Sequence, residues 1–334
     1  MMQQSEYMVQ GFKASAVKAG LKKDKGLDLA LIFSERETAV AGVFTTNKVV
    51  AAPVILTREH TKDGRARAII ANAGNANACT GKAGFNDACR TAELVADRLG
   101  IGPDEVLVAS TGVIGQPLNV DNIVEALPSL VERLSPDGIP MAARAIMTTD
   151  SFAKISHFEG HAGGRPYRIL GVAKGAGMIM PNMATMLCFI VSDIRIDSND
   201  LNGILSSSVV ATFNRITVDG DTSTNDTVLV MANGMAGNTA LTEADSKGFA
   251  RGLETVMGEL AQMIVRDGEG ATKVIHMEIK GAHSASDALK AARTVGNSSL
   301  VKTACYGQDP NWGRIMAALG RADIVMDEEK VDIW

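Results

Sequence analysis

Residues 174–194, KGAGMIMPNMATMLCFIVSDI, join a glycine-rich apolar loop to a strand-like run of large apolar residues. Ala184 and Thr185 stand where the loop meets this run. A hydroxyl is a weak nucleophile unless a base lies beside it, and a threonine released at a new N-terminus carries its own α-amine as that base. The junction therefore predicts a nucleophile at Thr185 that is exposed by cleavage of the Ala184–Thr185 bond.

The composition is that of a well-buried globular protein. The 334 residues are 46% hydrophobic and 21% charged, which suits one large or two ordinary domains. The net charge of −5 comes without a basic block and only 4% of the residues are aromatic, so we expect no nucleic-acid partner. The first twenty residues have no apolar core, and no window approaches 18 uninterrupted apolar residues. We therefore expect no signal peptide, no membrane span and a cytoplasmic location.

Cysteine, histidine and carboxylate spacings do not predict a metal site. The four cysteines match neither a zinc pattern nor a disulfide framework, so we expect structural thiols, and Cys188, inside an apolar run, is expected to be free and buried. The polar segment 213–229, FNRITVDGDTSTNDTVL, spaces its oxygen-bearing side chains as a calcium loop does, but it lacks a glutamate at the twelfth position. His157 and His161, close to glycines, predict a turn.

Short strands alternate with amphipathic helices along the chain, which predicts a mixed α/β fold with helices covering the sheets. Strands are expected at residues 27–34, 39–45, 68–73, 105–109, 186–191, 227–231 and 273–279. Helices are expected at residues 86–99, 121–134, 139–147, 201–213, 241–266, 285–293 and 312–319, with a kink or break at Pro128. Neither a repeat nor a linker divides the chain, so composition gives no domain boundary.

Three loops are candidates for contact with a ligand. ASTGVIG, residues 109–115, can point backbone N–H groups at an anion, as an oxyanion hole does, or form a plain turn. ANAGNANACTG, residues 71–81, suits a close approach of the backbone to a ligand or another chain. The loop at residues 174–178 lacks the order of a phosphate-binding motif and leads into a strand, so we expect no phosphate there.

Seven motifs together resemble the ornithine acetyltransferase family of arginine biosynthesis. They are GVFTTNKVVAAPV from Gly42, ANAGNANACTG from Ala71, STGVIG from Ser110, TTDSFAK from Thr148, KGAGMIMPNMATML from Lys174, FNRITVDGDTSTNDT from Phe213 and GQDPNWGRI from Gly307. The likeness extends from about Gly11 to the end of the chain. The combination is highly specific, although no single motif would suffice.

The resemblance implies an α/β fold, a layered α-β-β-α sandwich of two central sheets with outer helices, similar in layering to the N-terminal nucleophile hydrolases. It implies self-cleavage into an α chain, residues 1–184, and a β chain, residues 185–334, that stay together and assemble as an α2β2 heterotetramer. The implied reaction moves an acetyl group from N2-acetylornithine to glutamate without a cofactor or metal. Some members of the family also use acetyl-CoA as the donor.

The same resemblance assigns roles to individual residues. It makes Thr185 the nucleophile, Thr111 and Gly112 the oxyanion hole, and Thr148, Lys174, Thr185 and Glu269 the substrate-binding residues. An acetyl-threonine ester would divide the transfer into two easier steps, with the freed amine taking and returning the proton. Lys174 and Glu269 match in kind the α-carboxylate and the distal ammonium group of ornithine.

Two alternatives stay open on the residues alone. An autoproteolytic amidase or aminopeptidase would use the same Thr185 chemistry with water or an amine as the acceptor. An inactive truncated homologue would make no use of it. Family members continue past the position of Trp334 with a stretch that contributes an asparagine and a hydroxyl residue to the substrate site, so we expect the chain as written to bind substrate weakly.

Overall fold

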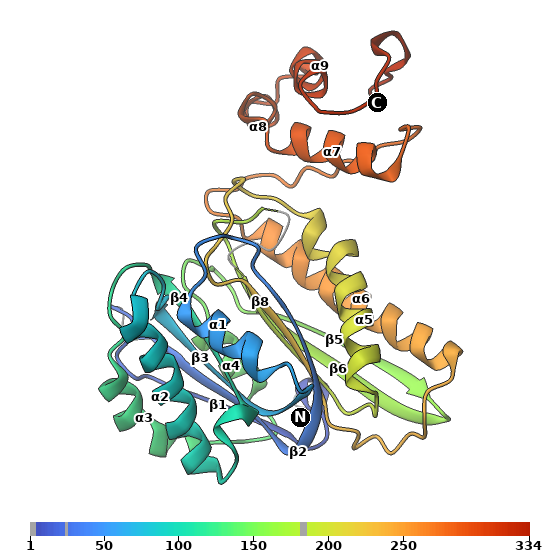
Figure 1. The fold of residues 1–334 in the computed structure, drawn as a ribbon. Coiled ribbons are helices and arrows are strands. Elements are labelled where there is room, and N and C mark those ends of the chain that lie inside the picture. The colour runs from blue at the N-terminus through green and yellow to red at the C-terminus, as the bar shows by residue number, and fades with distance from the viewer. Residues whose placement is uncertain (1–4, 24–25, 181–185) are drawn as a thin grey trace.

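The computed structural model describes residues 5–23, 26–180 and 186–334, which fold around one mixed sheet (Figure 1). The strands are β1 (Phe12–Val17), β2 (Leu29–Phe44), β3 (Arg65–Asn75), β4 (Val106–Val113), β5 (Lys154–Ala162), β6 (Arg165–Lys174), β7 (Leu187–Ser192) and β8 (Thr227–Ala232). The helices are α1 (Ala52–His60), α2 (Gly81–Leu99), α3 (Val120–Glu132), α4 (Ile139–Ala145), α5 (Ser198–Ala211), α6 (Glu243–Arg266), α7 (Ala285–Gly296), α8 (Ser299–Tyr306) and α9 (Trp312–Gly320). The mixed α/β class expected from the sequence is confirmed.

Strand β2 belongs to both halves of the sheet. Its first part, residues 29–33, pairs with β1 on one side and β3 on the other, whereas residues 39–44 pair with β8. Its register shifts between Phe33 and Thr38, around three exposed residues. A bulge of this kind bends a strand and increases its twist. The sequence predicted two strands here because the polar residues at the bend interrupt the apolar pattern.

The two halves of the sheet face each other. The strand order is β4-β3-β2-β8-β7-β6-β5, so β4 and β6 are five strand spacings apart, or about 24 Å in a flat sheet. Yet Lys174 at the end of β6 lies 3.4 Å from Thr111 of β4. The expected α-β-β-α layers are therefore present, but as two halves of one bent sheet rather than two separate sheets, because bulged β2 runs through both.

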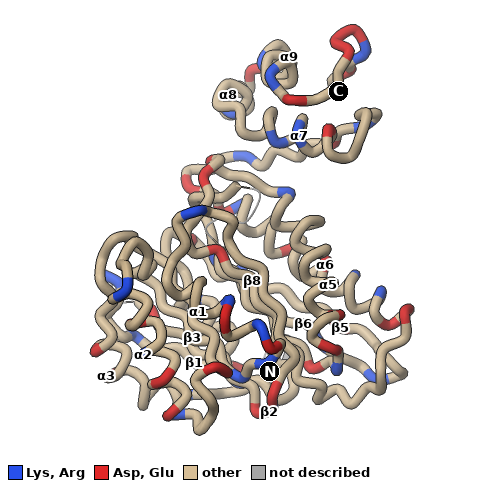
Figure 2. The backbone as a smooth tube through the Cα atoms, viewed as in Figure 1, with Lys and Arg blue, Asp and Glu red and all other residues tan. Residues whose placement is uncertain are grey.

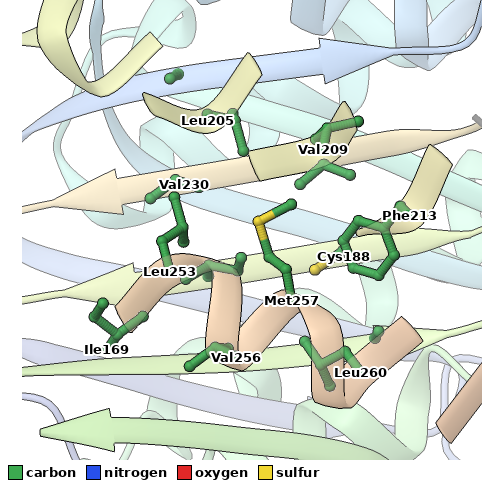
Figure 3. Close-up of a cluster of buried hydrophobic side chains, with 14 of the residues drawn as sticks. Ile169, Cys188, Leu205, Val209, Phe213, Val230, Leu253, Val256, Met257 and Leu260 are labelled. Carbon is green, nitrogen blue, oxygen red and sulfur yellow. The ribbon is translucent and has the colours of Figure 1, made fainter. Parts of the chain in front are cut away.

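Each layer boundary has its own apolar core. The inner core joins side chains of both halves, such as Ile69 and Leu107 with Leu170 and Phe189, and α4 packs among them. A second core lies under α2 and α3 on the outer face of β1–β4. A third core lies between helices α5 and α6 and the outer face of β6–β8. In this core the side chain of Met257 on α6 lies close to Cys188 on β7 (Figure 3).

A hairpin formed by β5 and β6 was not predicted from the sequence. Its turn uses Gly163 and Gly164, both with positive φ, and His157 and His161 lie on β5 rather than in the expected turn. Gly160 of β5 is directly opposite Tyr167, whose ring occupies the space that a Cβ would fill. The sequence of β5 is polar and contains glycine, so it does not have the pattern of a strand. Pairing with β6 stabilises it as one.

Helix α3 continues through Pro128, so the chain does not leave the helix at the position where a kink or break was expected. One other expectation at the level of secondary structure was wrong. Residues 271–280 form neither helix nor strand and are almost entirely exposed, although their alternating apolar residues predicted a strand at 273–279. A strand needs a hydrogen-bonded neighbour, and no described strand lies beside this segment. Helices α7–α9 follow it and pack around a small cluster of their own (Figure 1). None of the described helices is long and apolar enough to cross a membrane.

Candidate active site

A buried lysine lies at the end of β6, where the two sheet halves approach each other. Lys174 is only 2% exposed, and its Nζ donates a hydrogen bond to the hydroxyl of Thr148 at 2.7 Å. The hydroxyl of Thr111, on β4, accepts from the same Nζ at 3.4 Å. Three residues predicted as site residues from distant parts of the sequence are therefore in direct contact.

Asp150 holds this arrangement together and was not predicted as a site residue. Its Oδ1 accepts from the backbone N–H of Gly175 at 2.6 Å and from Lys154 Nζ at 2.7 Å. Its Oδ2 accepts from the backbone N–H of Thr148 at 3.0 Å and lies 3.8 Å from Lys174 Nζ. Burial opposes ionisation of this carboxyl, but the adjacent Lys174 and Lys154 outweigh it and hold the pKa of Asp150 below its ordinary value.

Lys154 extends the charged cluster to the end of α6. Its Nζ lies 2.6 Å from Oδ2 of Asp267, and the side chain of Asp267 is only 4% exposed. Asp267 also accepts from the backbone N–H and hydroxyl of Ser151. Burial opposes ionisation, but hydrogen bonds from Lys154 and Ser151 leave the pKa of Asp267 below its ordinary value. Two lysines and two aspartates thus neutralise one another below the surface.

Lys174 is the member of this cluster best suited to an anionic ligand. Burial lowers its pKa, and nearby Lys154 acts in the same direction, while Asp150, Asp226 and Glu269 oppose the shift. A carboxylate bound beside Lys174 would favour its charged form and compensate for the lost hydration. The sequence motif TTDSFAK already held Asp150 and Lys154, and its paired opposite charges were the signal that could have identified them.

The start of β7 lies beside another buried carboxyl group. Met186, which directly follows Thr185 in the sequence, donates its backbone N–H to Oδ1 of Asp226 at 2.9 Å. Asp226 is fully buried, and within the described part of the chain its Oδ2 has no hydrogen-bond partner. Burial raises the pKa of Asp226 well above its ordinary value. Ala184 and Thr185 themselves lie outside the described residues.

Gly112 and Thr111 lie at the tip of β4, against β3. Gly112 has φ of +137°, and a Cβ at this position would come within 2.3 Å of the backbone carbon of Gly74. Only glycine fits there without moving the backbone. A cavity of about 10 Å³, close to the volume needed for one water molecule, is lined in part by Thr111, Gly112 and Asn225. A space of this size, with hydroxyl and amide groups in part of its wall, can hold a single oxygen atom of a ligand.

Glu269 lies at the outer side of the same site. Its backbone N–H donates to the carbonyl of Ala176 at 2.8 Å, and its carboxylate lies against Gly177, where a Cβ would be 2.6 Å from Oε1. The residue is exposed, unlike Lys174. The loop after β6 therefore has a buried cation at its start and an exposed anion beside its middle.

The polar segment 213–229 fixes the backbone of the site. Asp219 accepts from the backbone N–H groups of Met178 and Ile179 at 2.5 and 2.9 Å. Asn225 donates to the carbonyl oxygens of Ala76 and Ser110 at 2.6 and 2.9 Å. Across the described ranges, no group of His, Cys, Asp and Glu is arranged to hold a metal ion. The abundant polar side chains of this segment hold loops in place.

Together these observations define a layered α/β protein with a buried, charge-compensated cluster at one end of the sheet, next to the residue that follows Thr185. The chain belongs to the ArgJ family, whose model matches residues 13–334. The family membership expected from the seven motifs is thereby confirmed.

Relatives with assigned names are similar over nearly the whole chain. The arginine biosynthesis bifunctional protein ArgJ of Geobacter sulfurreducens is 52% identical over 328 residues, which are 98% of this chain and 84% of that protein. The glutamate N-acetyltransferase of Methanocaldococcus jannaschii is 50% identical over 328 residues, 97% of this chain and 79% of that protein. A chain in the crystal structure of Bacillus halodurans ArgJ is 36% identical, with a TM-score of 0.50 and coverage of 55% of this chain and 96% of that one.

Proposed function

We propose that this protein transfers an acetyl group from N2-acetylornithine to glutamate through an acetyl ester on Thr185, after cleavage of the Ala184–Thr185 bond. Its membership of the ArgJ family makes it an acyltransferase of arginine biosynthesis. The observation that carries the proposed mechanism is the position of buried Lys174, in contact with Thr111 and Thr148. Lys174 is paired with Leu187 across β6 and β7, which brings this cluster close to the residue after Thr185.

The proposed reaction has two steps. The Thr185 hydroxyl oxygen attacks the acetyl carbonyl carbon, the threonine α-amine takes the hydroxyl proton, and the amide C–N bond breaks as that proton passes to the departing ornithine amine. The amine of glutamate then attacks the acetyl ester, the ester C–O bond breaks, and Thr185 regains its proton. Because ornithine leaves before glutamate reacts, the kinetics are ping-pong.

Thr111 and Gly112 stabilise the negative oxygen of each tetrahedral intermediate in this proposal. The small cavity at these residues and the space that only glycine leaves beside β3 support the assignment. A donor aimed at such an oxygen contributes roughly 3 kcal/mol to transition-state stabilisation.

Lys174 and Thr148 bind the α-carboxylate of the substrate, and Glu269 binds the distal ammonium group of ornithine. Support comes from the burial of Lys174, which makes a pairing with a carboxylate strong, and from the exposed position of Glu269 beside the loop that follows Lys174. Glutamate lacks the distal ammonium group. Removal of the Glu269 carboxylate should therefore weaken acetylornithine binding more than glutamate binding.

The two products of cleavage, residues 1–184 and 185–334, remain one catalytic unit and assemble as an α2β2 heterotetramer in this proposal. Strand β6 pairs with β7, and β2 pairs with β8, so the proposed products share one hydrogen-bonded sheet. The solved Bacillus halodurans chain is almost fully covered by about half of this chain, which is the length expected of a cleavage product. Acetyl-CoA is a second donor, and no cofactor is needed.

Thr185→Ala is the decisive test. Denaturing mass spectrometry should show two fragments for the wild type and one intact chain for the variant, and N-acetylglutamate formation should be lost. Thr255→Ala, an exposed position on α6, is the matched control and should behave as the wild type. Cleavage or transfer retained by Thr185→Ala would refute the mechanism. Acetate as the main product in the presence of glutamate would support the amidase alternative instead.

A further inference from the structure

The two ends of the proposed substrate site come from different segments of the chain. Lys174 and Thr148 lie at the end that binds the α-carboxylate, and Glu269, just after α6, lies at the end that binds the distal ammonium group. Ornithine holds its two charged groups at a separation set by the length of its side chain. A site selects such a ligand by length only if surrounding contacts hold its own charged groups in place.

Lys154 links the segments that carry these two ends. Its Nζ lies 2.7 Å from Oδ1 of Asp150 and 2.6 Å from Oδ2 of Asp267. Asp150 also accepts from the backbone N–H groups of Thr148 and Gly175, at 3.0 and 2.6 Å. Thr148 belongs to the carboxylate end, and Gly175 follows the lysine of that end. Asp150, Lys154 and Asp267 therefore form a continuous buried bridge of ion pairs that starts at the carboxylate end.

The far end of the buried bridge fixes the turn that carries Glu269. Asp267 follows the last turn of α6 and precedes Glu269 by two residues. Its side chain accepts from the backbone N–H of Ser151 at 3.0 Å, in addition to its contact with Lys154. The backbone N–H of Glu269 donates to the carbonyl of Ala176 at 2.8 Å. Glu269 is thus held both through the buried bridge and through the loop after β6.

Lys154 is a positioning group rather than a ligand-binding one. Its side chain is 0% exposed, and its Nζ lies 4.9 Å from the centre of the Phe152 ring. Charge is unusual inside this sheet: strand β8, TVLVMA, in the middle of the strand order, carries no charged residue (Figure 2). Buried ion pairs contribute little net stability compared with apolar side chains of similar volume. A role in fixing geometry therefore explains the buried bridge better than stability does.

We propose that Lys154 and Asp267 are positioning residues that set the substrate length accepted by the site, because they hold Glu269 at a fixed separation from Lys174. This inference rests on the proposed function, in which Glu269 binds the distal ammonium group of ornithine. The buried bridge makes the site selective for ornithine over diamino acids whose side chains are longer or shorter by one methylene group. Glutamate lacks the distal ammonium group, so its binding does not depend on the buried bridge.

The double variant Lys154→Met/Asp267→Asn removes the buried bridge and keeps the site neutral. Lys174 and Asp150 remain as one cation and one anion, 3.8 Å apart. Asp267→Ala, which removes only the far contact of Lys154, is the second variant and keeps the inference testable if the double variant fails to fold.

The matched control is Lys247→Met/Glu243→Gln. It removes an ion pair of the same kind and length, 2.6 Å, on the same helix, but the two side chains are 67% and 84% exposed. An exposed pair of this kind fixes no other group, so we expect the control to keep the substrate preference of the wild type.

Calorimetric titration of the mature protein with ornithine, lysine and 2,4-diaminobutyrate tests the inference without turnover. The wild type should bind ornithine about tenfold more tightly than either of the other two, as expected for one methylene group in a fitted site. In the double variant and in Asp267→Ala the preference should fall to about threefold or less. A wild type that binds all three alike or not at all, or folded variants that keep the full preference, would overturn the inference.

Kinetics of acetyl transfer separate positioning from a general structural defect. The ratio of kcat/KM for N2-acetylornithine to that for N2-acetyllysine should fall by at least about threefold in the double variant, while the KM for glutamate stays within about twofold of the wild type. Equal losses for both donors and for glutamate would give the buried bridge a purely structural role and overturn the inference. A wild type that transfers no acetyl group, but whose preference for ornithine in the titration depends on the buried bridge, would refute the proposed reaction and leave this inference standing.

Discussion

Asp150→Asn removes one of four charges from a cluster that is neutral and almost fully buried. The side chains of Asp150 and Lys154 are 0% exposed, Lys174 is 2% exposed and Asp267 is 4% exposed. The variant leaves two ammonium groups facing one close carboxylate. Breaking a buried pair by removing one partner costs about 3–5 kcal/mol. Asparagine can still accept from Gly175 N–H, so we expect the free energy of unfolding to fall by about 3 kcal/mol, at the lower end of that range.

The double variant Asp150→Asn/Lys154→Gln tests whether charge is the cause. It restores neutrality, since Lys174 and Asp267 remain as one cation and one anion. We expect the double variant to be more stable than the sum of the two single variants predicts, by about 1–3 kcal/mol. Urea unfolding followed by circular dichroism measures this, with every variant made in the Thr185→Ala chain so that the cleavage state is the same.

Two results would refute this reasoning. A loss below about 1 kcal/mol for Asp150→Asn would show that the buried pairs are weak or are replaced by water. Strictly additive losses would show that the side chains contribute independently through shape or hydrogen bonding rather than through mutual neutralisation.

Three further outcomes are expected. Gly112→Ala should destabilise the protein more than Gly115→Ala, because both glycines have positive φ but only Gly112 has backbone within 2.3 Å of the new Cβ. Gly115→Ala should lower the free energy of unfolding by about 1 kcal/mol. Equal losses for the two variants in urea unfolding would contradict this explanation by packing. Burial raises the pKa of Asp226 above its ordinary 3.8, so the folded state keeps a proton that the unfolded state releases. The free energy of unfolding of the Thr185→Ala chain, compared with that of the same chain carrying Asp226→Asn, should therefore fall as the pH rises above about 3.8. A difference that does not change with pH would contradict this. Cys79 is exposed, whereas Cys188 is buried and burial raises its pKa. A thiol reagent should therefore label Cys79 in the native protein and Cys188 only after unfolding, as measured by peptide mass mapping. Equal labelling rates would show that the strand containing Cys188 opens.

Much of the secondary structure could be predicted from local pattern. The amphipathic helices corresponding to α2, α5 and α6 were expected within a few residues of their observed bounds, because periodic apolar positions and caps are written in the sequence. The capping pair Thr242 and Asp245 is one such signal, and the structure shows its reciprocal hydrogen bonds. Strands were less predictable: polar β5 depends on β6 for its stability, and the apolar alternation at 273–279 has no described neighbour to pair with.

The candidate site was predicted in part, from motif resemblance rather than from local apolar pattern. Thr111, Thr148, Lys174 and Glu269 came from motif resemblance, and the structure places the first three in contact. Asp150 and Asp226 were not predicted as site residues. The charge pair of Asp150 and Lys154 was a local signal, but the burial of both aspartates and their contacts with Gly175 and Met186 depend on segments far along the chain.

The sequence by itself determined the family and the mixed α/β class, and it predicts the Ala184–Thr185 junction, because motifs, periodicity and turn residues are local properties of a chain. Only the tertiary structure decided that β2 bends one sheet into two layers and thereby brings Thr111 against Lys174 across five strand spacings. It also decided that Lys154 pairs with Asp267. The physical reason is that burial and electrostatic neutralisation depend on which segments meet in space, and that meeting is set by long-range strand pairing and core packing.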